Sequence, residues 1–333
     1  MRLRLESRVA VTVTALALMV LGPAAQALPS PWAWWPFDDD SDPTAELIHG
    51  VTGDLASNIG AAGPTFTVGT SALPGIDCNR AALYFDGADD YVAIVDPGGS
   101  ADLDGFSAVT LSAWVKPDGT AGGAVISKYD THNAWLSYYL GLNPGDLRVR
   151  MLIGGAGGQN SSNEVYLGAD GATLTPGVWS HIVGVWVGGT GPSSIRLYVD
   201  GVASATAYFA NREFTGMYQG AVPVEIGAVH SVSGRQVGRS SFYRGHIDDP
   251  RIYTTALDSA DVAELAAGGA ALDACDACPI ACQPQTERVF FGVVRRGSDG
   301  TLGSIQCWSV GSAVECRRDA SGALLIGPPE CAP

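Results

Sequence analysis

Lysine is almost absent from this sequence. Only Lys116 and Lys128 occur among the 333 residues, and the formal net charge is −15 at pH 7. A strongly acidic chain without a basic stripe is repelled by phosphate backbones, so we expect no nucleic acid partner. The excess of carboxylates instead favours bound divalent cations, which prefer oxygen ligands.

Long hydrophobic runs are also lacking after residue 27. Before that point, three arginines precede an apolar run over 9–21, and the segment ends in Ala25-Gln26-Ala27. This pattern predicts a secretory signal peptide over 1–27. The alternative, a single-pass anchor, needs about 20 apolar residues. We therefore predict an exported protein, secreted or periplasmic, whose mature part (formal charge −17 after loss of three arginines and one glutamate) has no membrane span.

Familiar catalytic signatures are missing as well. Retaining glycosidases need two carboxylates about 5 Å apart, whereas Glu164, Glu213 and Glu225 are isolated from one another in this sequence. The five histidines lack zinc-ligand spacing, and neither a Gly-x-Ser-x-Gly elbow nor a phosphate loop occurs. We therefore predict a protein that is not an enzyme.

Glycine, in contrast, is abundant, with 43 residues. Turn residues separate many short strand-like segments between 82 and 253, and Asp86-Gly87 and Asp200-Gly201 are hairpin signals. Only one helix is expected, over 260–267. Many short strands without intervening helices predict an antiparallel sandwich or barrel.

Alternation within these segments predicts which side chains are buried. Leu111, Leu140 and Leu197 fall on aliphatic sides, whereas polar and aromatic residues occupy the opposite sides. A period of two places the aliphatic set between two packed sheets and leaves the other set on solvated outer faces. The predicted fold class is all-β, a two-sheet antiparallel jelly-roll sandwich.

The end of the chain predicts a second, small unit. We place the main domain at 28–267, a linker at 268–287 and a cysteine-rich unit at 275–333. A short exported segment with six cysteines favours disulfides, although zinc at the first three stays an alternative. Cys78 is either free or tied to this unit. The predicted disulfide cysteines are Cys275, Cys278, Cys282, Cys307, Cys316 and Cys331.

An ordered series of motifs resembles the laminin-G-like group of the concanavalin A-like lectin/glucanase superfamily, in particular its pentraxin-like branch. The resemblance covers about residues 35–267 and implies a jelly roll, often calcium-bearing, that recognises carbohydrate or protein ligands. The motifs are Trp35-Pro-Phe-Asp38, Ala82-Leu-Tyr-Phe-Asp-Gly87, Leu111-Ser-Ala-Trp-Val-Lys-Pro117, Trp179-Ser-His-Ile-Val-Gly184, Ile195-Arg-Leu-Tyr-Val-Asp-Gly201, Val224-Glu-Ile-Gly-Ala228 and Tyr243-Arg-Gly-His-Ile-Asp-Asp249.

Calcium is the expected cofactor. If the first and last strands pair, as in the resembling family, acidic residues from both ends of the domain meet at one sheet edge. Carboxylates that face one another repel without a cation, so we predict a structural Ca²⁺ held by Asp38, Asp39 and Asp248. The alternative is a solvated acidic loop.

The predicted ligand site uses aromatic rings and arginines on the solvated sheet faces. Sugars stack on flat aromatic faces, while polar groups fix their hydroxyls. The alternatives are ordinary cross-strand pairs and a site in rim loops that contain Asp89, Asp90 and Asp170. The predicted ligand-binding residues are Trp114, Tyr139, Arg148, Arg150, Arg196 and Tyr198.

Together, these features predict a secreted binding module for a glycan or glycoprotein. A structural or adhesive cell-surface protein is the alternative from another class, and an unfamiliar glycan-active enzyme is the third. The sequence does not predict the ligand's identity or the oligomeric state.

Overall fold

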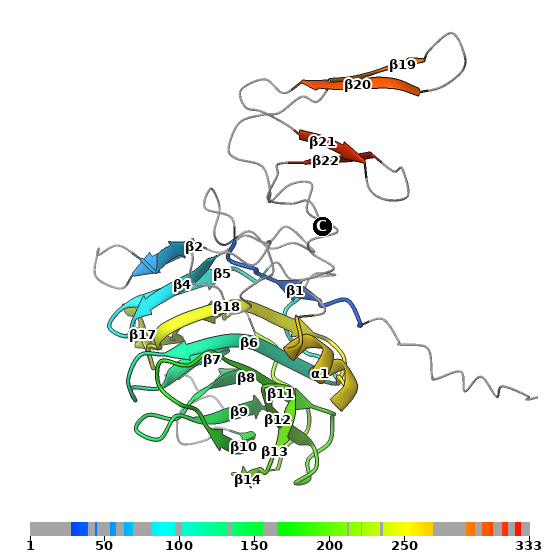
Figure 1. Ribbon diagram of the computed structural model, residues 1–333. Coiled ribbons are helices and arrows are strands. Elements are labelled where there is room, and N and C mark those ends of the chain that lie inside the picture. Colours follow the sequence, from blue (N-terminus) through cyan, green and yellow to red (C-terminus); the bar gives the residue numbers. More distant parts are fainter. Residues whose placement is uncertain are drawn as a thin grey trace, which may run out of the picture.

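The computed structural model describes residues 28–38, 44, 54–57, 63–68, 81–96, 102–131, 135–155, 165–211, 213–220, 222–233, 236–268, 291–296, 302–308, 315–318 and 324–327 (Figure 1). Several predicted features lie outside these residues. They are the signal peptide, Asp39, Cys78, residues 269–287 of the linker and four of the six cysteines of the C-terminal unit. None of the helices among the described residues is long and apolar enough to cross a bilayer.

Two antiparallel sheets form the main domain. The eight-stranded sheet has the order β13-β12-β11-β6-β18-β4-β3, with β1 paired to β18. Its strands are β1 (Ala33–Trp34), β3 (Thr65–Val68), β4 (Ala81–Asp86), β6 (Val109–Pro117), β11 (Ser180–Trp186), β12 (Ile195–Val199), β13 (Val202–Ser204) and β18 (Arg244–Tyr253).

The ten-stranded sheet has the order β14-β10-β9-β8-β7-β15-β5-β2, with the β16–β17 hairpin attached to β7. The one parallel contact in this sheet joins His230 to Asp130. Its strands are β2 (Asp54–Ser57), β5 (Asp90–Ile94), β7 (Gly123–Asp130), β8 (Trp135–Leu142), β9 (Arg148–Gly154), β10 (Tyr166–Thr173), β14 (Ala207–Ala210), β15 (Val224–Ile226), β16 (Val229–Ser233) and β17 (Gln236–Ser240).

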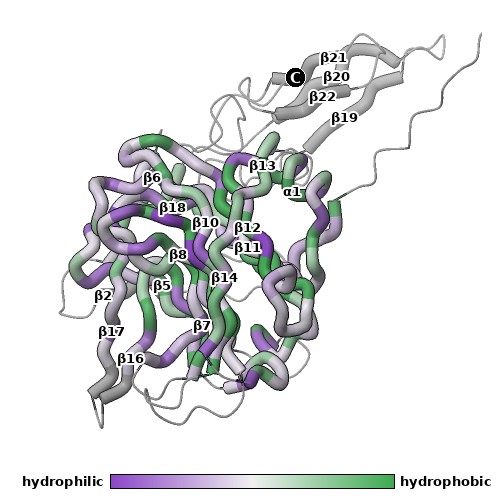
Figure 2. Tube along the Cα trace, turned by 90° about the horizontal axis from the view of Figure 1, so that it is seen from below, coloured by the Kyte–Doolittle hydropathy of each residue, from purple (hydrophilic) through white to green (hydrophobic). Residues whose placement is uncertain are grey.

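The core lies between the two sheets, as the alternation predicts. Leu111 and Leu140 are completely buried, and Leu197 is 1% exposed. All three belong to one hydrophobic cluster that draws residues from both sheets. Hydrophobic and hydrophilic residues alternate along the tube in Figure 2. The predicted two-sheet antiparallel sandwich is therefore confirmed.

The predicted helix is confirmed as α1 (Ser259–Ala266), which covers part of the outer face of the eight-stranded sheet (Figure 1). Its apolar side buries Val262 and Leu265 in a second cluster with Tyr198 and Tyr253. This face of the sheet is thus partly a second core and not a fully solvated surface.

Four short strands lie in the C-terminal unit. β19 (Phe291–Arg296) pairs with β20 (Leu302–Trp308), and β21 (Glu315–Arg318) pairs with β22 (Leu324–Gly327). Cys307 and Cys316 fall on β20 and β21. The disulfides of this unit stay a prediction.

Candidate functional site

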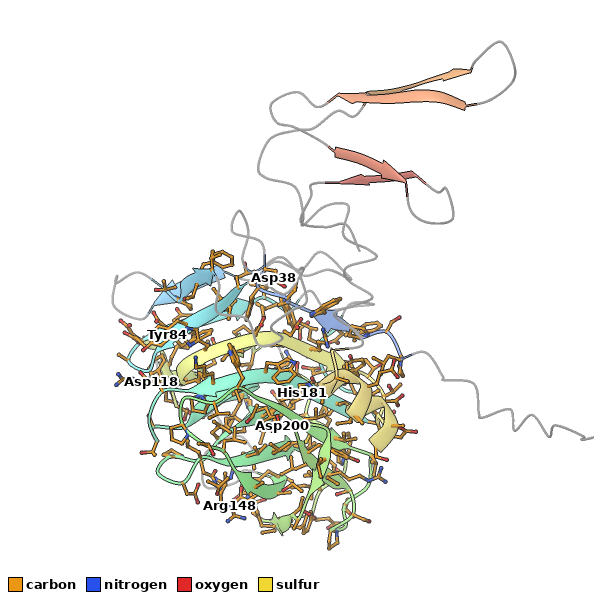
Figure 3. The ribbon with its side chains drawn as sticks, viewed as in Figure 1. Asp38, Tyr84, Asp118, Arg148, His181 and Asp200 are labelled. Carbon is orange, nitrogen blue, oxygen red and sulfur yellow. The ribbon has the colours of Figure 1, made fainter. Side chains whose placement is uncertain are left out.

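The six predicted ligand-binding residues do not form one site. Three of them lie on the eight-stranded sheet, namely Trp114 on β6 and Arg196 and Tyr198 on β12. Tyr139 on β8 and the two arginines of β9 lie on the ten-stranded sheet. Figure 3 marks Arg148 on the ten-stranded sheet and His181 on the eight-stranded sheet. Each group shares a face of its own sheet, but the two groups lie on different sheets.

Burial removes three of these residues as exposed stacking platforms, and Tyr139 is one of them at 9% exposed. Trp114 is 8% exposed, and its ring lies 5.1 Å from that of His181. Tyr198 is 3% exposed because α1 packs over it. The expectation of exposed aromatic platforms at Trp114, Tyr139 and Tyr198 is therefore wrong. Arg196, by contrast, is exposed.

The same sheet holds a buried serine–histidine pair. The His181 Nε2 and Ser112 Oγ atoms are 2.8 Å apart, and both side chains are inaccessible to solvent. Within the described part of the chain, His181 Nδ1 has no hydrogen-bond partner that would orient the ring as a base. Burial, followed by the charge of Arg251, lowers the pKa of His181 to about 3. A substrate cannot reach this pair, so its role is structural.

The outer face of the ten-stranded sheet carries a bidentate ion pair. Arg150 Nε and Nη2 donate to the two carboxylate oxygens of Asp170 at 2.6 and 2.9 Å. The Arg150 side chain is 35% exposed, and its guanidinium lies 5.3 Å from the Phe209 ring centroid. Burial alone would raise the pKa of Asp170, but the hydrogen bonds and charge of Arg150 outweigh it and lower that pKa. Asp170 is therefore held ionised.

Two glycines allow aromatic rings to lie over this face. A Cβ atom on Gly141 would come within 2.4 Å of the Tyr139 hydroxyl, and one on Gly168 within 2.3 Å of the Phe209 ring. Tyr166 meets Phe209 edge to face, with ring centroids 6.0 Å apart. Because neither glycine has a side chain, the rings occupy the space above the strands. We call Tyr139, Arg150, Tyr166, Asp170 and Phe209 the aromatic–arginine face.

A second polar group anchors the β16–β17 hairpin onto the same sheet. Glu225 Oε1 lies 2.5 Å from Arg239 Nε and 3.2 Å from His230 Nδ1. The Arg239 guanidinium stacks 4.4 Å from the Tyr91 ring centroid. Glu225 is completely buried. The sequence shows Glu225 as an isolated acid, because its partners come from a hairpin whose position depends on the fold.

The structure tests the geometry of the predicted calcium site only in part. β1 and β18 pair, as expected. Asp38 Oδ1 accepts the Ala81 N–H at 3.0 Å, Asp248 is buried, and Asp39 lies outside the described residues. The neighbouring Asp249 carboxylate already accepts the indole N–H of Trp34. The calcium site at Asp38, Asp39 and Asp248 therefore stays a prediction.

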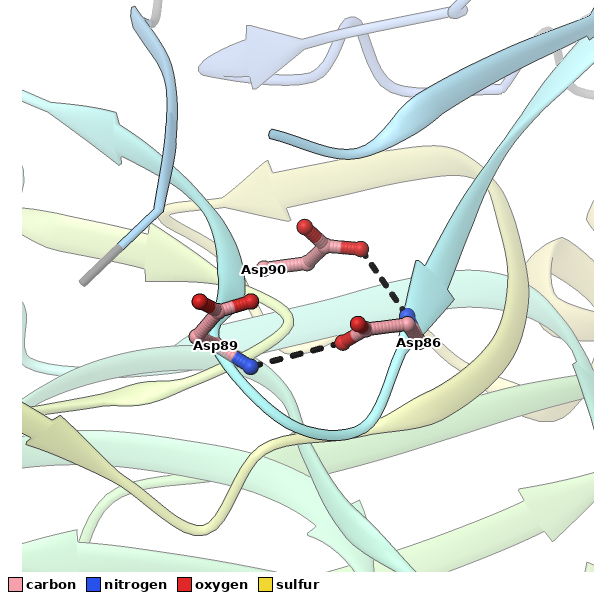
Figure 4. A group of neighbouring side chains, drawn as sticks. All are labelled: Asp86, Asp89 and Asp90. Atoms are coloured by element: carbon pink, nitrogen blue, oxygen red, sulfur yellow. Dashed lines mark hydrogen bonds between the residues drawn. The ribbon is translucent and has the colours of Figure 1, made fainter. Parts of the chain in front are cut away.

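Carboxylates do converge elsewhere in the described part of the chain. Asp86, Asp89 and Asp90 come together in the β4–β5 turn, with ligand oxygens within 4.8 Å of one another (Figure 4). Asp86 Oδ1 accepts the N–H groups of Ala88 and Asp89, and Asp90 Oδ2 accepts that of Asp86. Burial raises the pKa of Asp90, and the charges of Asp86 and Asp89 add to this rise. This group could hold a metal ion, but its hydrogen bonds are those of a tight turn.

A second acidic group, which we call the inner acidic cluster, consists of Asp96, Asp102 and Asp104. Lys128 reaches it from β7 and is completely buried. Its ammonium nitrogen lies 2.5 Å from Asp96 Oδ2 and 3.1 Å from Asp104 Oδ2. The sequence singled out neither these acids nor the lysine as a site, because the three acids are not arranged in a metal-binding motif.

Comparisons with solved structures find proteins with a similar chain fold at low sequence identity. Domain 4 of AbnA, a GH43 extracellular arabinanase from Geobacillus stearothermophilus solved with arabinotriose, is 20% identical, with a TM-score of 0.48 over 72% of this chain and 100% of that chain. The binding domain of botulinum neurotoxin serotype D is 9% identical, with a TM-score of 0.46 over 72% of this chain and 51% of that chain. No curated protein matches the sequence.

A family model covers more than half of the chain. The Laminin_G_3 model, described as the concanavalin A-like lectin/glucanases superfamily, matches residues 86–263. The matched span includes most strands of both sheets and the beginning of α1. Membership of the pentraxin-like branch stays a prediction. On the strength of this match, the chain belongs to the concanavalin A-like lectin/glucanases superfamily.

Proposed function

We propose that this protein is a non-catalytic module that binds carbohydrate on the outer face of its ten-stranded sheet. The observation that supports the proposal is the partly exposed Arg150–Asp170 ion pair, which lies beside the Phe209 ring. Sugars present apolar C–H faces that pack on aromatic rings and hydroxyls that bond to fixed charged groups. The aromatic–arginine face offers both kinds of contact within one patch.

The carboxylate side chains of this sheet favour a binding role over a catalytic one. Glu225 is the one glutamate in the described strands of the ten-stranded sheet. It is buried and ion-paired with Arg239 and His230. Glycoside hydrolysis needs an accessible pair of carboxyl groups, one of them as a proton donor. Asp170 on the aromatic–arginine face is ion-paired with Arg150 and has a lowered pKa, so neither Asp170 nor Glu225 is suited to act as a proton donor.

Export and calcium binding belong to the same proposal. The N-terminal 27 residues have the pattern of a secretory signal, and a glycan-binding module acts outside the cytoplasm. Two groups of carboxylates among the described residues could hold a metal ion. We propose that Ca²⁺ stabilises the sandwich without contributing to a reaction.

A glycan array with the full-length mature protein, probed with and without Ca²⁺, tests the proposal. We expect Arg150→Ala to raise the Kd for the best-bound glycan at least tenfold, because it removes a charged donor and the main ion-pair partner of Asp170; tenfold equals about 1.4 kcal/mol. Arg196→Ala is the matched control, since Arg196 is an exposed arginine on the other sheet. It should leave the Kd unchanged.

Two outcomes would contradict the proposal. One is the absence of any bound glycan, which would favour a protein partner instead. The other is equal loss of binding in Arg150→Ala and Arg196→Ala, which would place the site off the aromatic–arginine face. Melting curves of both variants show whether the fold is retained, and Asp170→Asn offers a second, milder change at the same ion pair.

A further inference from the structure

The inner acidic cluster lies where three parts of the sandwich meet. Asp96 follows β5, and Asp102 and Asp104 precede β6. The ligand oxygens of the three carboxylates all lie within 4.8 Å of one another. The side chains of Asp96 and Asp104 are only 9% and 2% exposed. Water therefore screens these charges little, and their mutual repulsion is strong.

Lys128 compensates only part of this charge. Its ammonium pairs with Asp96 and Asp104, and it also donates to the backbone carbonyls of Gly220 and Val222. Three carboxylates and one ammonium leave two net negative charges at a site where Asp104 is buried and Asp96 and Asp102 are partly buried. An excess of two negative charges in such a place favours bound protons or a further cation. One divalent cation would balance the group.

A buried hydroxyl points to the same place. Tyr138 lies opposite Lys128 in the β7–β8 pairing, and its side chain is completely buried. Its hydroxyl has no hydrogen-bond partner among the residues that the structure describes. The cross-strand neighbour Lys128 bonds to Asp96 and Asp104, so the Tyr138 side chain lies on the same side of the sheet as the lysine that reaches the cluster. Burial raises the pKa of Tyr138, and the charges of the three carboxylates raise it further. An unpartnered polar atom in such a position is rare in folded proteins.

We infer that the inner acidic cluster is a divalent-cation site, with Ca²⁺ as its ion and Asp96, Asp102 and Asp104 as its carboxylate ligands. Ca²⁺ binds oxygens at about 2.4 Å, so two ligands on opposite sides of the ion are about 4.8 Å apart. The spacing of the carboxylates meets this limit. The Tyr138 hydroxyl supplies a neutral oxygen next to the ion.

The site ties together segments that the sheets alone do not join. Asp104 Oδ2 also accepts the N–H of Gly220 at 2.9 Å, just before β15. Bound Ca²⁺ thus fixes the β5–β6 connection against the segment that leads into β15. This inference stands apart from the proposed glycan binding, because none of its residues belongs to the aromatic–arginine face.

Calorimetric titration of Ca²⁺ into the full-length mature protein, after treatment with a chelator, tests the inference. We expect a site that Asp102→Asn weakens at least tenfold, together with a rise in melting temperature on adding Ca²⁺ that this variant loses. Asp89→Asn is the matched control, because it removes one carboxylate from the other acidic group. It should leave this site intact. Asp248→Asn separates the site from the calcium predicted at the β1–β18 edge.

Terbium luminescence supplies a second readout, since Tb³⁺ replaces Ca²⁺ and is excited by a nearby tyrosine. We expect Tyr138→Phe to reduce the emission while Ca²⁺ binding is largely kept. The inference is overturned if the wild-type protein binds no Ca²⁺, or if binding disappears in Asp89→Asn or Asp248→Asn but persists in Asp102→Asn. Unchanged emission in Tyr138→Phe would contradict the position of the ion.

Discussion

Burial of His181 makes the stability of the sandwich depend on pH. Its pKa is about 3 in the folded protein, against about 6.5 in an unfolded chain. Between these values the unfolded chain binds more protons, so acidification favours unfolding. Stability should therefore fall from about pH 6.5 downward and level off near pH 3. Chemical denaturation at pH 6.5 and pH 4 should show that His181→Gln loses about 3 kcal/mol less than the wild type.

Ser112→Ala is the control for this prediction. It removes the hydroxyl 2.8 Å from His181 Nε2 but keeps the buried imidazole, so the pH dependence should remain. Ionised Asp170 adds to the acid sensitivity of every variant alike, because its pKa is lowered in the fold. Parallel pH profiles for His181→Gln and the wild type would contradict the prediction.

The sequence predicts the sheet face of a side chain, but it does not predict whether other segments cover that side chain. The sequence placed Arg150 and Tyr139 on one sheet face, and the structure keeps them on one face, with Arg150 partly exposed and Tyr139 buried. It placed Trp114 and Tyr198 on solvated faces, but neighbouring elements cover both. Lys128 is one of only two lysines in the sequence, and nothing local shows that it is buried beside three acids. A period-two pattern does not show which side chains are covered by segments that are distant in the sequence.

Helix α1 depends on its N-terminal cap. Asp258 accepts the N–H groups of Ala260 and Asp261, and the Asp261 side chain accepts the Asp258 N–H, which completes a capping box. Asp258→Ala should lower the free energy of unfolding by about 1 kcal/mol. Asp258→Ser keeps a capping oxygen and should lose much less. Equal loss in both variants, measured by denaturant unfolding, would show that the cap contributes nothing.

The sequence predicts individual strands and turns better than it predicts which strands pair with one another. Strand faces follow from alternation, and the turn at Asp200-Gly201 follows from its residues, which both adopt positive φ angles. Which sheet a strand joins depends on connections that cross from one sheet to the other, such as that from β10 to β11. The candidate site needed this information, because Arg150 and Arg196 have the same local pattern but lie on different sheets.

At the scale of the whole molecule, hydrophobic burial holds the sandwich together. Its main cluster joins aliphatic and aromatic residues from both sheets, and no described residue of the sandwich is a cysteine. The tail differs, since it contains six of the seven cysteines in fewer than 60 residues. So short a segment buries too little apolar surface to fold without disulfides or another cross-link. The two parts should therefore respond differently to reduction.

We expect a reducing agent to leave the main melting transition of the mature protein almost unchanged, because the apolar contacts of the sandwich do not depend on thiol chemistry. The tail should lose its protection against proteases under the same conditions. Mass spectrometry after alkylation should count one free thiol before reduction and seven after it, since seven cysteines leave one unpaired. A large drop in the main melting temperature on reduction would mean that Cys78 ties the sandwich to the tail. In that case one tail cysteine, and not Cys78, would carry the free thiol.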